Sequence, residues 1–345
     1  MNCRVCLSFL LWVITNKMNP NYLTHQVLAI SMIKSSQKQG NYTPSIGVLI
    51  PTFQAANHLI HCLPPIIQSP LKPKVLIIDS SSTDKTAAIA QELGAQVSII
   101  PQQNFNHGMT REKGRLLLGT DIVVMMTQDA YATSNTTLEE LVRPLLLGQA
   151  SISYARQLPH IGAGFFEAFP REFNYPSESH IRSIQDISKY GIYTFFCSNS
   201  CAAYLNRALD EVGGFPNVLF GEDTIVVAKL LERQHKIAYV ATAEVRHSHA
   251  YSLKQEFQRH FDIGLSRHLH QGLLAKGGKD SKRGQAYVKA LLSTLKSKYP
   301  LYIPYALLQS CIKFLGYKLG KLSTRAPLWL KKQLSSQPHY WTSKS

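Results

Sequence analysis

Residues 281–345 contain no aspartate or glutamate, although they carry 12 of the chain's 37 lysines and arginines. Residues 1–280 hold the other 25 basic residues and all 21 acidic residues, so most of the formal net charge of +16 falls on the C-terminal part. A segment with charge of a single sign indicates an anionic partner. That partner could be a nucleic acid, a membrane surface or a phosphorylated substrate.

Two signatures of nucleotide-binding enzymes are also missing. No Gly-x-Gly-x-x-Gly follows the first predicted strand, and no Walker lysine motif occurs in the chain. Their absence argues against a dinucleotide-dependent oxidoreductase and against a P-loop enzyme. The six cysteines are scattered and form no disulfide framework, which fits a reducing cytoplasm.

Long hydrophobic runs are absent as well. The apolar run at residues 5–14 is too short to span a bilayer, and no clear small-x-small cleavage site follows it. Residues 1–44 are therefore interpreted as an N-terminal extension of uncertain status, with Met18 and Met32 as further plausible starts.

Short apolar runs alternate with helical patterns from Ile46 onward. The runs are continuous, as in strands that are buried on both faces of a parallel sheet. Their alternation with helices predicts an α/β fold with a mostly parallel central sheet and right-handed crossovers. The predicted strands cover residues 46–51, 75–78, 97–100 and 121–126, and the predicted helices cover 57–68, 83–93 and 108–118.

Polar residues follow three of these strands, at the edge where ligands of such sheets bind. They are Thr52 after the first strand, Asp79 and Ser81 after the second, and Gln128 and Asp129 after the fourth. A single strand-end aspartate is usually a turn or capping residue. Two aspartates on one edge favour a ligand site.

The alternation stops after residue 147. A strand is predicted near residues 152–155, an irregular stretch at 159–189, a strand with a turn at 193–204, and a further strand at 237–241. Gly221-Glu222-Asp223 opens a predicted helix. Two carboxylates in a first helical turn suit the helix dipole, so ordinary capping acids are one interpretation and a catalytic base is the other.

In this order and spacing, the motifs resemble those of the family 2 glycosyltransferases, which have the GT-A fold. The resemblance covers roughly residues 46–330, and bacterial rhamnosyltransferases are the most similar branch. Each matching segment is weak alone, and the set is strong together. The segments are 48–53, 77–86, 104–111, 127–130, 213–223 and 245–253.

The resemblance implies a role for each matching residue. Asp223 corresponds to the general base, and Glu222 to its supporting neighbour. Asp129 corresponds to the surviving ligand of an Asp-x-Asp motif, because Gln128 stands where the family has its first aspartate, and this departure leaves metal dependence open. The donor-binding residues are then Thr52, Asp79 (as the reader of the nucleobase), Ser81, His107, Arg111, Gln128 and Asp129. For Arg111, an ordinary surface position is the alternative.

One carboxylate provides too few ligands to hold a divalent metal ion, so further ligands are expected. His247 and His249 are candidates, because residues two apart in an extended segment share a face. The predicted cofactor is Mg²⁺ or Mn²⁺ held by Asp129, His247 and His249, and imidazole suits Mg²⁺ less well than Mn²⁺. A structural role for the histidines is the alternative.

The resemblance implies an inverting glycosyl transfer. The expected donor is dTDP-L-rhamnose, and the expected acceptor is a glycan or a polyprenyl-linked glycan in the synthesis of a cell-surface polysaccharide. The residues alone do not specify the donor sugar, the acceptor, the linkage or the oligomeric state. Two other classes stay open: a non-catalytic membrane-associated protein that retains the fold, and a nucleic-acid-binding α/β protein.

The basic C-terminal part is predicted as a helical region, residues 271–345, that follows a catalytic domain at 45–270. It is too polar to span a bilayer but suits a helix in the headgroup layer, where each Lys or Arg adds about 1 kcal/mol near anionic lipid. We expect peripheral attachment to the cytoplasmic face of the inner membrane through residues 281–345, and no nucleic-acid binding. A helix docked on the catalytic domain is the alternative. The apolar stripe, interrupted by Gly316, consists of Leu308, Ile312, Leu315, Leu319 and Leu322.

Overall fold

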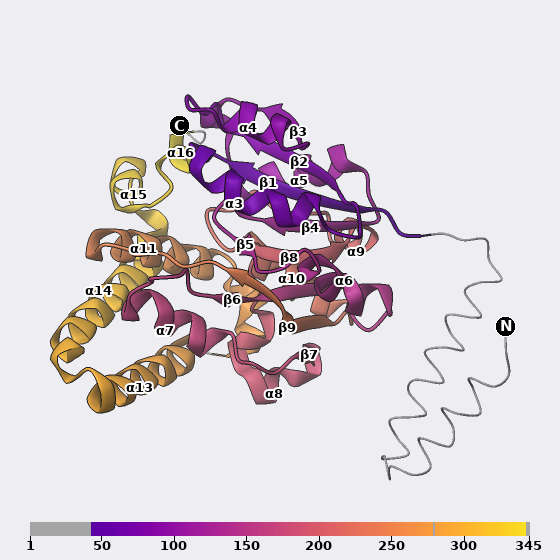
Figure 1. Ribbon diagram of the computed structural model, residues 1–345. Coiled ribbons are helices and arrows are strands. Elements are labelled where there is room, and N and C mark those ends of the chain that lie inside the picture. Colours follow the sequence, from indigo (N-terminus) through magenta and orange to yellow (C-terminus); the bar gives the residue numbers. More distant parts are fainter. Residues whose placement is uncertain (1–42, 279, 343–345) are drawn as a thin grey trace, which may run out of the picture. The chain divides into compact units, whose positions relative to one another are not determined.

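The computed structural model of this chain describes residues 43–278 and 280–342 (Figure 1). Residues 45–345 form one compact unit. The N-terminal extension predicted at 1–44 falls almost entirely outside the described residues.

One nine-stranded sheet runs through this unit, in the order β3-β2-β1-β4-β8-β6-β9-β5, with β7 paired to β9. The pairs β1–β2, β2–β3 and β1–β4 are parallel, as predicted, whereas β8 is antiparallel to both of its neighbours, so the whole sheet is mixed. The strands are β1 (Ile46–Thr52), β2 (Lys74–Asp79), β3 (Gln96–Ile99), β4 (Ile122–Met126), β5 (Tyr131–Ala132), β6 (Ile152–Leu158), β7 (His180–Arg182), β8 (Cys201–Leu205) and β9 (Ile237–Arg246).

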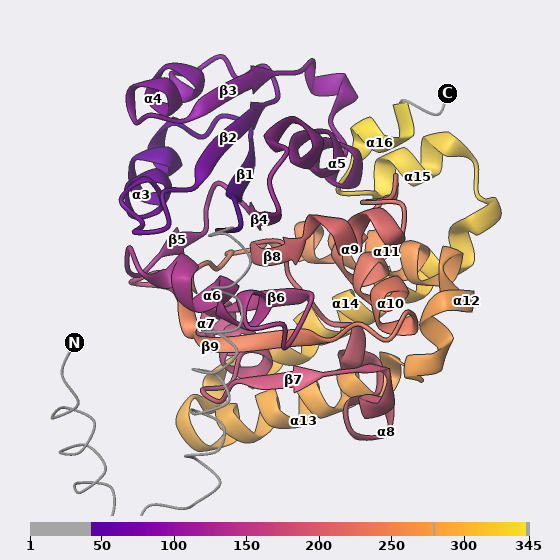
Figure 2. The same ribbon diagram turned by 90° about the vertical axis from the view of Figure 1, so that its right-hand side faces the viewer.

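Helices cover both faces of the sheet, and this explains the continuous apolar runs. On β1, Val48 and Ile50 belong to one buried cluster while Leu49 belongs to the other, as the alternation of side chains along a strand requires. Figure 2 shows α3 and α4 on one side of β1 and β2, and α5 on the other. The predicted helices of this half are confirmed as α3 (Ala56–Ile67), α4 (Thr86–Glu92) and α5 (His107–Leu118), and they are joined by α6 (Thr137–Leu146), α9 (Asn206–Glu211) and α10 (Glu222–Glu232).

The stretch predicted to be irregular contains a helix, α7 (Phe165–Asn174). Phe165, Phe169 and Phe173 recur every four residues along one face of α7, and this face packs against Leu291 and Leu295 far along the chain. The prediction was wrong there because the partners of these aromatic side chains are distant in the sequence. Residues 193–204 were predicted as a strand with a turn. Residues 191–195 form a short 3-10 helix, and the strand begins only at Cys201.

The chain after the sheet is helical. Its elements are α11 (Leu253–Leu269), α12 (Gln271–Leu274), α13 (Asp280–Lys298), α14 (Ile303–Leu322), α15 (Leu328–Leu334) and α16 (Pro338–Thr342); short helical turns lie at α8 (Ile187–Tyr190), η1 (Gln102–Asn104), η2 (Ile184–Asp186), η3 (Gly191–Phe195), η4 (Ala275–Gly277), η5 (Pro300–Tyr302) and η6 (Ser323–Arg325).

Helix α14 packs on α11 through glycine. A Cβ atom at Gly316 would collide with the carbonyl oxygen of Phe257, and one at Gly320 would collide with that of Phe261. The sequence indicated that Gly316 interrupts the apolar stripe, whereas the structure places Gly316 on a different face of α14. It belongs to the buried face of α14 and allows the two backbones to touch.

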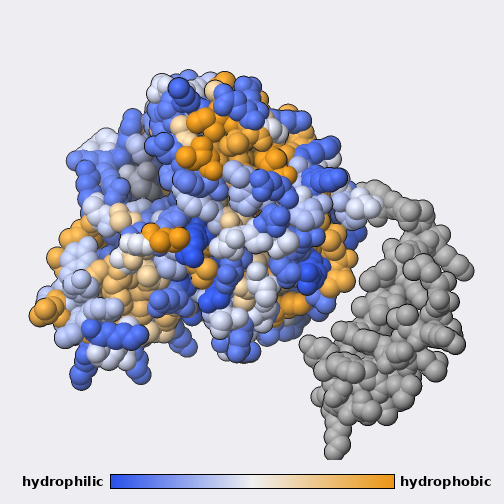
Figure 3. All heavy atoms as spheres, viewed as in Figure 1, coloured by the Kyte–Doolittle hydropathy of each residue, from blue (hydrophilic) through white to orange (hydrophobic). Residues whose placement is uncertain are grey.

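The apolar stripe of α14 points the other way. Leu308, Leu315, Leu319 and Leu322 are 43–79% exposed, and Figure 3 shows hydrophobic residues along the outer edge of α14. Among the helices of residues 43–278 and 280–342, none is both long and apolar enough to cross a membrane.

Candidate active site

A cavity of about 1960 Å³ opens at the carboxyl ends of β1, β4 and β9 and extends to α13 and α14. The structure brings nine of the eleven predicted site residues to its wall. They are Thr52, His107, Arg111, Gln128, Asp129, Glu222, Asp223, His247 and His249. Asp79 and Ser81 do not line this cavity.

Asp79 is buried behind the wall, where protein groups occupy both of its oxygens. Thr52 Oγ1 donates to Asp79 Oδ1 at 3.0 Å, and the backbone N–H of Ser82 donates to Oδ2 at 2.8 Å. Ser81 is turned toward β3, since its hydroxyl donates to the carbonyl of Ile100 at 2.8 Å. The two residues thus fix the shape of the loops that follow β1 and β2.

Gln128 joins the ends of β1 and β4. Its Oε1 accepts from the backbone N–H of Phe53 at 2.8 Å, while its Nε2 donates to the carbonyl of Phe53 at 3.1 Å. An aspartate here could not donate the second of these bonds. Both ends of the amide are therefore bonded to the backbone of Phe53, which explains why a glutamine suits the position where an aspartate was expected.

Asp129, His247 and His249 form a group with metal-ligand spacing, here called the His–His–Asp cluster. Strand β9 continues to Arg246, five residues beyond the predicted end, and delivers His247 directly to the cavity. Asp129 Oδ2 lies 3.5 Å from both His247 Nε2 and His249 Nδ1, and one ligand atom from each residue lies within 4.8 Å of the others. Donors that share one ion at about 2.1 Å lie up to about 4.2 Å apart. The two 3.5 Å spacings meet this limit, and the 4.8 Å bound on the widest pair exceeds it by about 0.6 Å, so a divalent cation would draw the two imidazoles slightly together.

The charge states of the cluster also suit a metal. Burial lowers the pKa of His247, and burial together with His247 lowers the pKa of His249 to about 3. Burial opposes ionisation of Asp129, but its histidine neighbours hold its pKa below the usual value. The imidazoles are therefore neutral and the carboxylate is ionised, which is the protonation state that binds a cation.

Gln157 orients the first of these imidazoles. Its Oε1 lies 2.9 Å from His247 Nδ1, and its Nε2 donates to Ser198 Oγ at 2.9 Å. The bond to Ser198 fixes which end of the amide faces the ring, so Nδ1 carries the proton and Nε2 presents its lone pair to the cluster. Gln157 was not identified from the sequence, because only the fold brings β6 beside β9.

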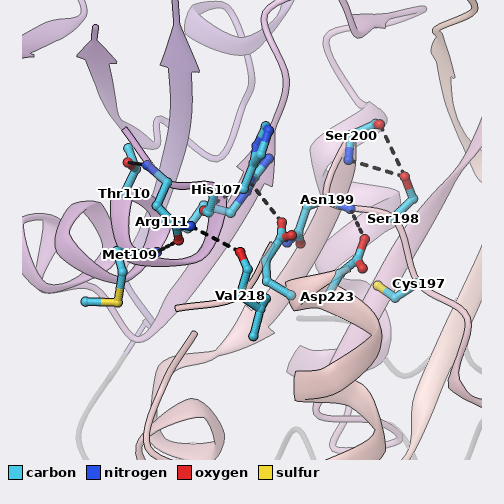
Figure 4. Close-up of polar contacts among 12 residues, drawn as sticks. His107, Met109, Thr110, Arg111, Cys197, Ser198, Asn199, Ser200, Val218 and Asp223 are labelled. Atoms are coloured by element: carbon cyan, nitrogen blue, oxygen red, sulfur yellow. Dashed lines mark hydrogen bonds and ion pairs between the residues drawn. The ribbon is translucent and has the colours of Figure 1, made fainter. Parts of the chain in front are cut away.

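Glu222 and Asp223 begin α10, after Gly221 with a φ of +77°. Glu222 Oε1 lies 3.0 Å from Arg111 Nη1 and accepts from Asn199 Nδ2 at 3.0 Å. Asp223 accepts from the backbone N–H of Asn199 at 3.3 Å and from that of Thr224 at 2.6 Å. Figure 4 shows Asp223 next to Cys197, with its hydrogen bond to Asn199.

These contacts shift the pKa values of the two carboxylates in opposite directions. Burial opposes ionisation of Glu222, but Arg111 and His107 hold its pKa below the usual value. Burial and the neighbouring charge of Glu222 raise the pKa of Asp223 to about 6. Asp223 is therefore a carboxylate that can hold or release a proton near neutral pH, whereas Glu222 stays ionised.

Arg111 and His107, predicted to contact the donor diphosphate, are engaged with the protein. The Arg111 side chain is 3% exposed and is held by Glu222 and by the carbonyl of His107. Burial and the charge of Arg111 lower the pKa of His107 to about 4. Both residues still line the cavity.

Several further cationic side chains line the cavity, among them Arg171 and Arg259, which were not identified from the sequence. Arg171 lies on α7, in the stretch predicted to be irregular, and Arg259 lies on α11. The helical pattern of α11 could have placed Arg259, but nothing in that pattern marks the side facing the cavity.

Comparison with known proteins gives consistent matches. Residues 47–213 match the family described as "Glycosyl transferase family 2". The chain is 37% identical to the O-antigen chain rhamnosyltransferase WbaN of Salmonella anatum, over 87% of this chain and 96% of that protein. It is equally identical to the O-antigen chain rhamnosyltransferase RfbN of Salmonella typhimurium, over 86% and 96%.

A solved structure shares the fold. It is the mannosyltransferase PcManGT from Pyrobaculum calidifontis in complex with GDP-Man and Mn²⁺. The match has a TM-score of 0.56 at 14% identity and covers 82% of this chain and 88% of that one.

Proposed function

The chain belongs to glycosyl transferase family 2, as its motifs predicted, and we propose that it transfers L-rhamnose from dTDP-L-rhamnose to a glycan or lipid-linked acceptor in the synthesis of a cell-surface polysaccharide. The predicted GT-A fold and glycosyltransferase class are confirmed by these comparisons. The sugar is supported by the names of two relatives that are 37% identical over nearly their whole length. One observation carries the mechanism: the His–His–Asp cluster and Asp223 line the same cavity.

A divalent metal fits the His–His–Asp cluster, and we propose Mn²⁺. Asp129, His247 and His249 would hold it, and the ion when bound would neutralise the charge of the leaving diphosphate. Two imidazoles suit Mn²⁺ better than Mg²⁺, which prefers oxygen ligands and retains its waters. The presence of Mn²⁺ in the related mannosyltransferase complex supports this choice.

Asp223 acts as the general base in this proposal. An acceptor hydroxyl gives its proton to the Asp223 carboxylate while its oxygen bonds to the anomeric carbon of the sugar. The bond from that carbon to the diphosphate breaks on the opposite face, and the nucleoside diphosphate leaves with the electron pair. Glu222 raises the basicity of Asp223 through its fixed negative charge, and Arg111 keeps Glu222 ionised.

The donor wall is proposed at the ends of β1, β2 and β4. Thr52 and Asp129 face the cavity and can touch the nucleotide. Asp79, Ser81 and Gln128 act through the loops they hold. The role of Asp79 as reader of the nucleobase remains a proposal, and in this structure its oxygens are taken by Thr52 and Ser82.

The acceptor is proposed to be presented at an anionic membrane surface, on the cytoplasmic face of the inner membrane. Residues 281–345 carry 12 basic and no acidic residues. Leu308, Leu315, Leu322 and Trp329 expose about half or more of their surface on α14 and α15. Apolar side chains flanked by lysines suit the lipid interface, and α14 also borders the cavity.

A donor panel tests the function. The purified chain is incubated with Mn²⁺ and each of dTDP-L-rhamnose, UDP-N-acetylglucosamine and GDP-mannose, and release of nucleoside diphosphate is measured. We expect release from dTDP-L-rhamnose alone, and preferential release from another donor contradicts the proposed sugar. If no donor is turned over but one binds, the non-catalytic alternative is favoured. Binding of DNA or RNA by residues 281–345 in preference to anionic liposomes would favour the nucleic-acid alternative.

A further inference from the structure

Helix α11 holds a guanidinium group between two aromatic rings at the cavity wall. The Cζ atom of Arg259 lies 4.8 Å from the ring centroid of Phe220 and 5.5 Å from that of Tyr251. Both distances are within the range of cation–π attraction. Among residues 43–278 and 280–342, no hydrogen-bond or ion-pair partner of Arg259 is found. The rings fix the guanidinium, and its N–H donors remain available to a ligand.

The two rings belong to opposite sides of the site. Phe220 immediately precedes Gly221, Glu222 and Asp223, and its carbonyl accepts from Ser266 Oγ of α11 at 2.6 Å. Tyr251 lies on the side of the metal ligands. The centroid of its ring is 4.9 Å from that of His249, a member of the His–His–Asp cluster. Arg259 therefore stands between the loop of Asp223 and the cluster.

Arg171 adds a second cation to this part of the cavity. It projects from α7, and its Nε is buried without a hydrogen-bond partner among the described residues. Arg171 and Arg259 line the same cavity as His247 and His249. By contrast, Arg111, which the sequence suggested for phosphate binding, is paired with Glu222.

We propose that Arg259, together with Arg171, forms a diphosphate-binding site between the His–His–Asp cluster and Asp223. A guanidinium presents a planar fork of N–H donors that matches phosphate oxygens. Arg171 and Arg259 are half-buried and form no ion pair with an acid among the described residues, which favours binding of an anion beside them. The inference rests on the proposed function, which supplies two sources of diphosphate: the nucleotide-sugar donor and a lipid-linked acceptor. In the donor arrangement, Arg259 would stabilise the charge that develops on the leaving group.

Calorimetric binding to the full chain with Mn²⁺ tests this site. The probes are dTDP, thymidine and geranyl diphosphate, and the variants are Arg259→Gln, Arg259→Lys, Arg171→Gln and, as control, Lys254→Gln. Lys254 is an exposed cation on the same helix. We expect Arg259→Gln to weaken the binding of dTDP about 10- to 100-fold, as loss of hydrogen bonds to a charged group implies. The affinity for thymidine should not change. The dTDP affinity of Arg259→Lys should fall between those of the unmodified protein and Arg259→Gln, because lysine keeps the charge but lacks the planar fork. Arg171→Gln should weaken binding of the same diphosphate to a smaller extent.

The outcomes separate the sources and the possible errors. If Arg259→Gln loses affinity for dTDP only, the site belongs to the donor. If it loses affinity for geranyl diphosphate only, the site belongs to the acceptor. Unchanged binding of both diphosphates in Arg259→Gln overturns the proposal, as does an equal loss of thymidine. Circular dichroism and the melting temperature check the fold of each variant. Because binding needs no turnover, failure of rhamnosyl transfer with Arg259-dependent diphosphate binding would overturn the proposed function and leave this site standing.

Discussion

The Arg111 guanidinium lies 3.0 Å from the carboxylate of Glu222. In the described part of the chain, the adjacent Asp223 accepts hydrogen bonds only from the backbone of Asn199 and from Thr224. The two neighbouring acids at the start of α10 therefore differ in pKa. The salt bridge fixes the charge of Glu222, and that fixed charge, added to burial, raises the pKa of Asp223 to about 6.

The rate of transfer should rise with pH through about 6. Asp223 accepts a proton only in its ionised form, and with its pKa raised to about 6 this form disappears as the pH falls below that value. A profile of kcat/KM against pH should therefore show an acid limb near pH 6 and a plateau above it. Glu222→Gln should move the limb to lower pH, because the Glu222 charge raises the pKa of Asp223. A limb near pH 4 in the unmodified protein would contradict the base assignment.

Asp223→Asn should lower turnover about 10²- to 10⁴-fold, the usual contribution of a general base. Donor affinity should be retained, because the amide keeps the shape of the side chain. Nucleotide-sugar binding and single-turnover rates separate the two effects. Glu172→Gln, an exposed acid on α7, is the matched control and should behave as the unmodified protein does. Full turnover in Asp223→Asn would remove Asp223 from the mechanism.

Gln128→Glu should destabilise the chain without improving metal binding. A carboxylate can still accept from the Phe53 N–H but cannot donate to the Phe53 carbonyl, which it would repel. Loss of that hydrogen bond costs about 0.5–1.5 kcal/mol of unfolding free energy, measurable by urea denaturation. Mn²⁺ titration should show no gain in affinity, and tighter Mn²⁺ binding in Gln128→Glu would identify position 128 as a latent ligand.

Metal affinity should depend on the orientation of His247 as well as on the ligands. His247→Ala and His249→Ala each remove one donor of the cluster and should abolish measurable Mn²⁺ binding at micromolar metal. Gln157→Leu leaves every ligand in place but releases His247 Nδ1, and should weaken Mn²⁺ about 10- to 100-fold. His235→Ala serves as control, because His235 pairs with Glu211 and does not line the cavity. Equal Mn²⁺ affinity in all four variants would place the metal elsewhere.

Attachment to anionic vesicles should depend on the outer face of α14. Leu315→Glu places a negative charge on a side chain that is 48% exposed, so it should reduce co-sedimentation with phosphatidylglycerol vesicles and leave the fold intact. Leu116→Glu, which changes a 62% exposed leucine on α5, is the control and should sediment normally. Equal loss in both variants, or none in either, would contradict membrane docking through α14.

The sequence was sufficient for the parts of the fold that rest on local pattern. Continuous apolar runs predicted the strands β1 to β4, and their carboxyl ends predicted where Thr52 and Asp129 would meet. The spacing of His247 and His249 predicted a shared face, and in the segment that follows β9 both rings lie 3.5 Å from Asp129. These features follow from periodicity and from chain topology, both of which can be seen in a single sequence.

Features that depend on distant partners were missed. Helix α7 is stabilised by aromatic contacts with residues more than a hundred positions away, so its own segment looked irregular. Arg111 was assigned to phosphate because its buried partner, Glu222, belongs to another helix. Gln128 looked like a lost ligand because its actual partner is backbone, which no side-chain pattern reports.

The glycine contact between α11 and α14 has a mechanical consequence. At Gly316 and Gly320 the two backbones touch with no side chain between them to absorb displacement. Helix α11 carries Arg259 and Ser266, and Ser266 holds the backbone of Phe220 just before Asp223. A force applied to the outer side of α14 is thus transmitted by rigid backbone to the loop that bears Asp223.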